Sequence, residues 1–385
     1  MDPEATRKKP RMTTTRFCGT LLAALLLCGC DSETTATKQE GDLTEGELFK
    51  EEIRPGEEEE FAKFAERIQA IQEKHAQNAD GAIQRGFHAK MHACLQGELT
   101  VMEDIPEEAR YGLFAEARSY SAWVRLSNGQ GKVQDDKERD VRGLAIKVVG
   151  VEGKKLLDVD QDAKTQDFNM TNRRASHVDD AAEFMEFAEA TVSDLKFAGY
   201  LATHPKVALR LAKVKKNVPS LLSEQYWSGG AFKLGPRAVK LSAKPCEALD
   251  KKMPEDPTPD YLREDFRKSL AEADACFDLM VQFQVDPKAQ PIERASVEWD
   301  ETVAPFVPVA RLRIPQRDLD APENAERAAA EEAYCQKLSF TPWHALPDHR
   351  PLGHINRARK AVYQGSREHR SIEDYVPEPD GSEQF

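Results

Sequence analysis

The sequence predicts an α+β fold: an antiparallel sheet or barrel with helices packed around it. Segments typical of strands are clustered along the chain, and segments typical of helices form other clusters, whereas a parallel sheet would need the two types to alternate. The chain has 385 residues, of which 40% are hydrophobic. A chain of this length and composition can bury a core that encloses a cavity of cofactor size.

The periodicity of apolar residues distinguishes the two types of element. Between residues 57 and 77, Phe61, Phe64, Ile68 and Ile71 recur at three- or four-residue spacing, which is the period of an amphipathic helix. Further helices are predicted over residues 180–190, 206–216, 261–275 and 321–338. Short runs of alternating or β-branched apolar residues predict strands. These cover residues 95–102, 122–127, 143–149, 277–285 and 306–314.

The charge balance argues against one class of function. Lys and Arg together number 54 and Asp and Glu together number 67, so the formal net charge is −13. A nucleic-acid-binding protein needs a clustered basic surface, so we expect no nucleic-acid partner. The same balance argues against binding of the folded body to anionic lipid.

The N-terminus has the pattern of an export signal. Basic residues precede an apolar run over residues 17–27, which is about half the ~20 residues that a membrane-spanning helix needs. The run leads into the sequence Leu-Cys-Gly-Cys at residues 27–30, which resembles a bacterial lipobox. We therefore predict a lipoprotein signal over residues 1–29, lipidation at Cys30 and a location in the bacterial cell envelope, facing the periplasm or the cell exterior. An ordinary cleaved signal peptide is the alternative.

Composition divides the rest of the chain into three parts. Residues 30–60 are rich in Thr, Glu and Gly and predict a flexible tether, so that the membrane is reached through the lipidated N-terminus only. Residues 61–375 predict the folded domain. Residues 376–385 contain Pro, Asp, Gly and Ser and predict a loose tail.

Several common types of site are disfavoured by spacing. The chain has no Gly-x-Ser-x-Gly nucleophile elbow, and the Gly-Gln-Gly-Lys sequence at residues 129–132 lacks the spacing of a phosphate-binding loop. The histidines lack the spacing and the helical context of a zinc site. The cysteines beyond the signal form no Cys-x-x-Cys pair, so one or two disulfides, unpaired by the sequence, and buried free thiols are both compatible with it. These cysteines are Cys94, Cys246, Cys276 and Cys335.

Three segments far apart in the chain hold the informative residues. In order, they contain Arg85 with His88, Arg125 with Ser127, and Arg359 with Tyr363 and Arg370. In this order and at these spacings they resemble the motifs of the haem catalase superfamily, over about three-quarters of the chain. The resemblance implies a catalase-like antiparallel β-barrel with surrounding helices, and haem b buried against the barrel as cofactor.

The resemblance also implies how haem would be bound. Tyr363 would be the axial ligand of the iron, as tyrosine is in catalases. Arg359 precedes it by four residues, on the same face of a helix, and would hold the phenolate in its ionised form. Arg85, Arg125 and Arg370 would bind the haem propionates, because guanidinium groups match carboxylates bidentately.

On the other face of the haem, the resemblance implies a catalytic group. His88 matches the distal histidine, which would accept a proton from a hydroperoxide and return it to the leaving oxygen. Ser127 would orient this histidine. A distal asparagine is also expected, and Asn172 is the best match, with Asn169 as the alternative.

Some positions depart from the family pattern. Where catalases have a Pro-x-Phe-Phe stretch after the asparagine, this chain has Arg-Arg-Ala-Ser-His at residues 173–177, so we expect the aromatic wall of the pocket to be lost. Phe87 stands where valine is usual, and Gly365-Ser366 replaces Asp-Thr. Such features, together with the absence of the classical C-terminal helical region, are typical of short, divergent catalase-related proteins. These include haem peroxidases and lipid-hydroperoxide isomerases of the allene oxide synthase kind.

The expected function is haem-dependent breakdown of hydroperoxides, by an oxidoreductase of the catalase or peroxidase type. Hydrogen peroxide and organic or lipid hydroperoxides are both possible small-molecule substrates. Because a fold does not determine an activity, the alternative is a catalase-like scaffold that binds or senses haem without catalysis. The sequence leaves open whether the chain forms a homo-oligomer.

Overall fold

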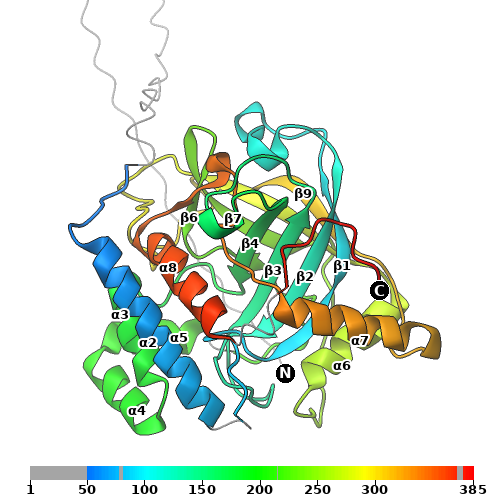
Figure 1. Ribbon diagram of the computed structural model, residues 1–385, viewed down its shortest axis with the longest axis horizontal. Coiled ribbons are helices and arrows are strands. Elements are labelled where there is room, and N and C mark those ends of the chain that lie inside the picture. Colours follow the sequence, from blue (N-terminus) through cyan, green and yellow to red (C-terminus); the bar gives the residue numbers. More distant parts are fainter. Residues whose placement is uncertain (1–49, 78–80, 215, 371–375) are drawn as a thin grey trace, which may run out of the picture. The chain divides into compact units, whose positions relative to one another are not determined.

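The computed structural model describes residues 50–77, 81–214, 216–370 and 376–385 (Figure 1). Contacts between Cα atoms divide the chain into Met1–Asp42 and Leu43–Phe385, and the second unit holds every helix, strand and apolar cluster described below. The predicted signal peptide, Cys30 and most of the predicted tether lie outside the described residues. Within the described ranges, no helix combines the length and the apolarity that crossing a membrane requires.

Eight strands of the described residues close into an antiparallel barrel. Their order is β7 (Arg237–Pro245), β5 (Tyr226–Trp227), β4 (Thr165–Thr171), β3 (Arg142–Val149), β2 (Ser119–Asn128), β1 (Met91–Val101), β9 (Val307–Ile314) and β8 (Ala275–Phe283), after which β8 pairs with β7. A short extension pairs with β7, and it consists of β6 (Ala231–Leu234) and β10 (Pro351–Leu352). The predicted antiparallel barrel is therefore confirmed.

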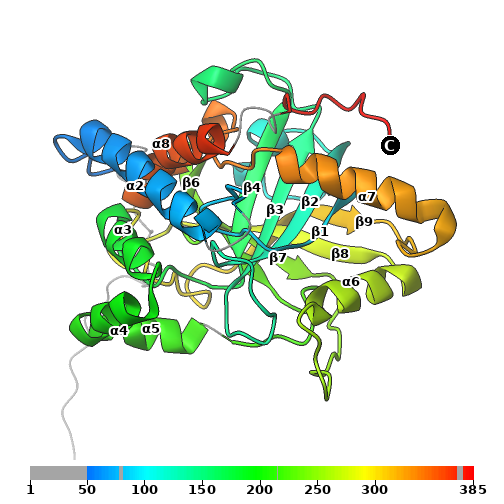
Figure 2. The same cartoon turned by 60° about the horizontal axis from the view of Figure 1, so that its bottom comes forward.

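Helices surround the barrel in two groups. They are α2 (Glu57–Gln77), α3 (Ala181–Ala190), α4 (Asp194–Thr203), α5 (Pro205–Val214), α6 (Tyr261–Glu272), α7 (Pro322–Lys337) and α8 (His354–His369). α2, α3 and α8 pack on one side, with α4 and α5 beyond α3, whereas α6 and α7 cover another side (Figures 1 and 2). The first group is held together by an apolar cluster that includes Phe64 and Ile68 of α2, Met185 of α3 and Ala358 of α8.

Alternation of side chains along a strand separates the barrel core from its outer face. On β2, Val124 and Leu126 belong to the apolar core, whereas Arg125 and Ser127 point the other way. All four are buried, because other parts of the chain cover the outer face of this strand. β2, which the sequence predicts from its apolar residues, therefore also presents polar side chains to a covered cavity outside the barrel.

The predicted elements are confirmed in type, with shifted ends. α2 covers the predicted residues, whereas α6 ends at Glu272 because β8 begins at Ala275. The sequence did not predict α4, β4, β5, β6, β7 or β10. In β4, only Phe168 and Met170 are apolar, because its other face carries polar residues. Such a strand gives no clear apolar signal.

Two disulfides join the cysteines that the sequence left unpaired. Cys94 of β1 is bonded to Cys335 of α7, and Cys246, directly after β7, is bonded to Cys276 of β8. The first links a helix to the barrel, and the second links two paired strands.

Residues 376–385, predicted as a loose tail, are packed against the barrel. The ring of Phe385 lies 5.4 Å from that of Trp123, and Glu378 forms a buried ion pair with Lys147 of β3. Composition indicated correctly that this segment has no helix or strand. It did not show that a terminal aromatic ring and one carboxylate offset the entropy of ordering the segment.

The predicted boundary between tether and domain, at residues 60 and 61, lies inside α2. The described residues before that boundary are also bound to α8. Arg357 Nη1 lies 2.8 Å from Glu51, and Arg357 Nε lies 2.8 Å from Glu57. The folded domain therefore includes residues that their Glu-rich composition assigned to the tether.

Candidate active site

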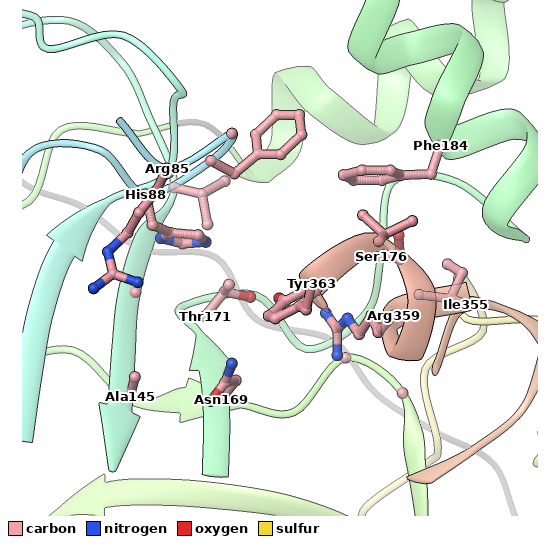
Figure 3. A pocket seen from close by; sticks show the side chains of 18 of the residues that line it. Arg85, His88, Ala145, Asn169, Thr171, Ser176, Phe184, Ile355, Arg359 and Tyr363 are labelled. Carbon is pink, nitrogen blue, oxygen red and sulfur yellow. The ribbon is translucent and has the colours of Figure 1, made fainter. Parts of the chain in front are cut away.

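A cavity of about 260 Å³ lies between the outer face of the barrel and helices α2, α3 and α8 (Figure 3). Residues from all three predicted segments line it, namely Arg85, His88, Arg125, Ser127, Arg359, Tyr363 and Arg370. The helices add apolar side chains, among them Phe64, Ile68, Phe184, Ile355 and Val362. The fold therefore brings together almost the whole predicted site from distant parts of the sequence.

The backbone at His88 has a conformation that side chains rarely adopt. In the described residues, His88 is the non-glycine position with a positive φ, of 59°. This left-handed conformation costs an L-residue roughly 1–2 kcal/mol. Two hydrogen bonds hold it: the His88 N–H donates to the Gly129 carbonyl at 3.1 Å, and Arg125 Nη2 donates to the His88 carbonyl at 2.8 Å. The barrel therefore fixes the direction of this side chain.

The His88 ring is held between two strands and points into the cavity (Figure 3). Its Nδ1 lies 3.1 Å from Ser127 Oγ on β2. On β3, a Cβ atom added to Gly143 would lie 2.5 Å from the same Nδ1. The close approach of the imidazole to the barrel therefore requires glycine at position 143.

His88 is neutral at neutral pH. Burial and the nearby positive charges of Arg125 and Arg173 lower its pKa to about 3. In the tautomer whose Nδ1–H donates to the Ser127 hydroxyl, Nε2 is free to accept a proton. The site thus holds a base at the cavity wall.

Arg359 and Tyr363 enter the cavity from α8, facing the wall that carries His88 (Figure 3). They are one helical turn apart, so they share a face of the helix. The guanidinium carbon of Arg359 lies 5.9 Å from the centre of the Tyr363 ring. Arg359 Nη1 donates to Asn356 Oδ1 at 2.9 Å, which fixes its direction.

Arg85, Arg125 and Arg370 bring three positive charges to the cavity wall. Arg85 Nη2 donates to the Leu338 carbonyl at 2.7 Å, and both Arg85 Nη2 and Arg370 Nη1 donate to the Gln336 carbonyl. Burial, followed by the charge of Arg370, lowers the pKa of Arg125 to about 9, and the same two causes act on the pKa of Arg85.

These arginines fit a ligand with two carboxylates. Nε of Arg85 and Nε of Arg125 are buried, and neither has a hydrogen-bond partner within the described part of the chain. Buried like charges with unused donors are unfavourable unless an anion joins them. A group with two carboxylates, as haem b has, matches both the charge and the donors.

Of the two candidate asparagines, the structure brings Asn169 into the cavity and not Asn172. Phe168 and Met170 of β4 point into the barrel core, so the residue between them, Asn169, faces outward and lines the cavity. Asn172 follows the strand; its Oδ1 accepts from the Arg142 N–H at 2.8 Å and its Nδ2 donates to Glu224 at 2.9 Å. Because no strand was predicted at β4, the alternation of side chains along it could not be used to choose between Asn169 and Asn172.

The segment at residues 173–177 adds a cation that the resemblance did not assign. Arg173 lines the cavity, and its Nη1 lies 2.6 Å from His177 Nδ1. Burial lowers the pKa of Arg173 to about 10, so it stays protonated at neutral pH.

Aromatic rings are nevertheless present beside the cavity, contrary to the expected loss of the aromatic wall. The Phe87 ring lies 5.3 Å from that of Phe184, and His177 packs on Phe187 at 4.1 Å. α3 supplies two of these rings, so they come from a different segment than the one that lacks the family's Phe-Phe pair.

No family model matches the sequence, and a search of curated proteins finds no match. Solved structures do match. A fungal catalase superposes with a TM-score of 0.59 at 19% identity over 78% of this chain and 63% of its own. Catalase A from Saccharomyces cerevisiae gives a TM-score of 0.62 at 18% identity, over 78% and 65%. A bacterial catalase gives a TM-score of 0.60 at 17% identity, over 83% and 66%.

These similarities establish the fold. The closed barrel with its surrounding helices is the catalase fold. The chain spans just under two thirds of the length of each of these catalases. At such low identity, the activity and the roles of single residues must be argued from the site itself.

Proposed function

We propose that this chain, which has the catalase fold, is a haem-dependent enzyme that breaks down hydroperoxides. One observation carries the proposal: His88 with Ser127 and Arg359 with Tyr363 lie on facing walls of one cavity. A second observation supports it: Nε of Arg85 and Nε of Arg125, two residues that line this cavity, are buried without a hydrogen-bond partner in the described residues.

In the proposed complex, Tyr363 would ligate the iron and Arg359 would stabilise the phenolate. Arg85, Arg125 and Arg370 would bind the two propionates. Haem b would supply the redox chemistry of its iron toward a hydroperoxide.

The protein supplies the proton transfer. Neutral His88 accepts the hydroperoxide proton on Nε2, while Ser127 holds Nδ1, and it then returns the proton to the departing oxygen. Asn169 is the amide at the cavity wall. Arg173 is a cation at the cavity wall, suited to stabilise negative charge on that oxygen.

The lining of the cavity bears on the substrate. Apolar side chains of α2, α3 and α8 face it on one side, which suits a hydroperoxide with an organic substituent as well as hydrogen peroxide. The proposed substrates are hydrogen peroxide and organic hydroperoxides, and we expect turnover of an organic hydroperoxide.

The proposed location is the cell envelope. Two disulfides support an oxidising compartment, because disulfides persist outside the cytosol and are rare within it. The lipoprotein signal with Cys30 remains part of this proposal. Labelling with a radioactive fatty acid would test it, and a Cys30→Ser variant that is labelled as strongly as the wild type would contradict it.

The activity is tested on protein reconstituted with haem, with oxygen evolution from hydrogen peroxide and consumption of an alkyl hydroperoxide as readouts. We expect turnover of at least one substrate and a loss of roughly a hundredfold or more in His88→Ala, the range for a general acid–base residue. Haem binding without any turnover would favour the alternative of a haem-binding or sensing scaffold. Failure to bind haem would contradict the proposal entirely.

A further inference from the structure

We propose that the α4–α5 helix pair docks the folded domain on the surface of an anionic phospholipid bilayer. The two helices lie beyond α3, at the edge of the molecule and away from the barrel (Figures 1 and 2). This inference goes beyond the proposed function and does not require haem.

The outer face of α4 carries an exposed leucine. Phe197 and Tyr200 pack in an apolar cluster with Phe187 of α3, and they define the inner face of the helix. Leu195 lies off that face and is 85% exposed. Ala198, one turn further on, is also exposed, so the outer face stays apolar along the helix.

The outer face of α5 combines an exposed leucine with lysines. Val207 and Leu211 are buried, whereas Leu209 between them is 60% exposed. Lys206 and Lys213 are exposed three residues before and four residues after Leu209, on the same face of the helix. An exposed leucine between two lysines offers an anionic bilayer one apolar contact and two positive charges.

The local charge is opposite to that of the whole chain. Residues 205–216 contain five basic residues and no acidic one, in a chain whose net charge is −13. Among these, Arg210 and Lys216 have acidic neighbours, whereas Lys206 and Lys213 remain exposed. Charges more than a Debye length of about 8 Å away are largely screened at physiological ionic strength. The net charge therefore does not prevent this face from binding anionic lipid.

Of the acidic groups on the neighbouring helix α3, one is paired away from the helix pair and one lies beside the turn between α4 and α5. Glu189 pairs with Arg67 of α2 at 2.5 Å, and Glu186 lies 3.7 Å from His204. On α4, the exposed charges of Asp194 and Lys196 are of opposite sign, so Lys206 and Lys213 leave the outer face of the helix pair with a net positive charge. Two copies of this face would repel each other, which favours an anionic bilayer over a second copy of the chain as the partner.

Docking would bring lipid close to the cavity. Leu211 lines the cavity from the inner side of α5, and Leu209 lies on the outer side of the same helix. A bilayer on the outer face would lie about one helix diameter, ~10 Å, from the cavity lining.

The test uses a fragment of residues 43–385, since Leu43–Phe385 is the compact unit that holds every described element. Omitting the N-terminal unit also removes the apolar run and Cys30, which would bind vesicles by themselves. Sedimentation is measured with vesicles of phosphatidylcholine alone and of phosphatidylcholine with 40% phosphatidylglycerol, at low and at high salt. We expect binding to the anionic vesicles that weakens with salt, and weak binding to the neutral ones.

Two double variants separate the apolar and electrostatic contributions. We expect Leu195→Asp with Leu209→Asp, and Lys206→Glu with Lys213→Glu, each to lower the partition coefficient about tenfold or more, at about 1 kcal/mol per basic residue near an anionic surface. Matched controls at other exposed sites, Ile53→Asp with Val303→Asp and Lys252→Glu with Lys288→Glu, should bind nearly as the wild type does.

Three results would overturn the proposal. They are no binding to anionic vesicles at low salt, equal loss of binding in the control variants, and a concentration-dependent dimer that only the two double variants of the α4–α5 helix pair abolish. Circular dichroism of each variant identifies unfolding. Haem binding by the double variants of the α4–α5 helix pair should be unchanged. Failure of the docking test and failure of the proposed enzyme activity can therefore be told apart.

Discussion

The two walls of the cavity are built by different principles. On the barrel wall, alternation along β2, β3 and β4 places Arg125, Ser127 and Asn169 outward while their neighbours fill the barrel core. On the helix wall, side chains from α2, α3 and α8 meet through a separate apolar cluster. The barrel wall is therefore fixed by hydrogen-bonded strands, whereas the helix wall depends on close packing of side chains between helices.

This difference separates two parts of the proposed function. The barrel wall carries the proton-transferring group in one fixed orientation. The helix wall carries the proposed iron ligand, most of the apolar lining and, through α5, the proposed bilayer contact. Two of the expected departures from catalase motifs lie at the cavity: Phe87 adjoins His88, and residues 173–177 supply Arg173 and His177 to the lining.

The largest expected effect comes from disturbing the barrel wall at Gly143. In Gly143→Ala, the new Cβ would lie 2.5 Å from His88 Nδ1, so the imidazole must move. A misplacement of about 1 Å can cost roughly a hundredfold in rate. We expect turnover of the haem-loaded enzyme to fall by that order while haem still binds.

Gly199→Ala is the matched control, because a Cβ at position 199 meets no atom within 4 Å. Steady-state kinetics of the two variants provide the comparison. Equal activity of Gly143→Ala and Gly199→Ala would mean that the orientation of His88 does not matter, contrary to the rigid role of the barrel wall.

The next effect concerns the arginines between the walls. Arg125→Gln removes a buried charge that Arg370 repels, and also the hydrogen bond to the His88 carbonyl; because the two effects oppose each other, we expect the ligand-free protein to keep its melting temperature. Haem affinity should fall about tenfold or more, since a hydrogen bond to a charged group contributes about 1.5–3 kcal/mol. Haem titration and calorimetry measure the two quantities. Unchanged haem affinity would exclude Arg125 as a propionate partner.

A smaller effect is expected at Arg173. Its charge lowers the pKa of His88, so Arg173→Gln should raise that pKa from about 3. Because neutral His88 is the proposed base, activity is lost as pH falls through this pKa, and the acid limb of the pH–rate profile should move to higher pH. A limb that stays in place, or moves to lower pH, would show that Arg173 does not act on His88. Arg174→Gln, at an exposed neighbour, is the control.

The smallest effect is on stability in acid. Burial lowers the pKa of His349 to about 3, and its Nε2 accepts a hydrogen bond from the Leu113 N–H at 2.8 Å. The unfolded chain, with an ordinary histidine pKa near 6.5, binds this proton more readily. Stability should therefore fall as pH decreases from about 6.5 toward 3. Melting temperatures across this range should fall less steeply in His349→Gln, and an unchanged slope would contradict the assignment.

The sequence predicts elements of both cavity walls, α2 and α3 on the helix wall and β1, β2 and β3 on the barrel wall, but it misses β4. β1, β2 and β3 have apolar runs whose period reveals them, and the motifs around His88 and Ser127 lie next to these runs. The order of strands round the barrel could not be predicted in this way, because pairing between distant segments leaves no mark on local periodicity. β7 pairs with both β5 and β8, although neither adjoins it directly in the chain.

The alternation of side chains along a strand explains why Asn169 lines the cavity and Asn172 does not. Alternation in β4 directs Asn169 to the cavity, but the strand contains Asp167 and Gln166 as well, so its apolar period is hidden. The buried partner of Asp167 is Lys147, in the neighbouring strand β3. Only the tertiary structure shows that these polar residues are paired and that the segment is a strand.

Binding of haem at Tyr363 is tested most directly by a titration of the purified protein with haem, followed by its absorption spectrum. We expect the wild type to bind one equivalent per chain, with the spectrum of a tyrosinate-ligated ferric haem. Tyr363→Phe should lose that spectrum, whereas Tyr334→Phe, at a tyrosine that packs against Trp123, should keep it. A wild type that stays colourless, or a Tyr363→Phe variant with the wild-type spectrum and turnover, would contradict the proposed site.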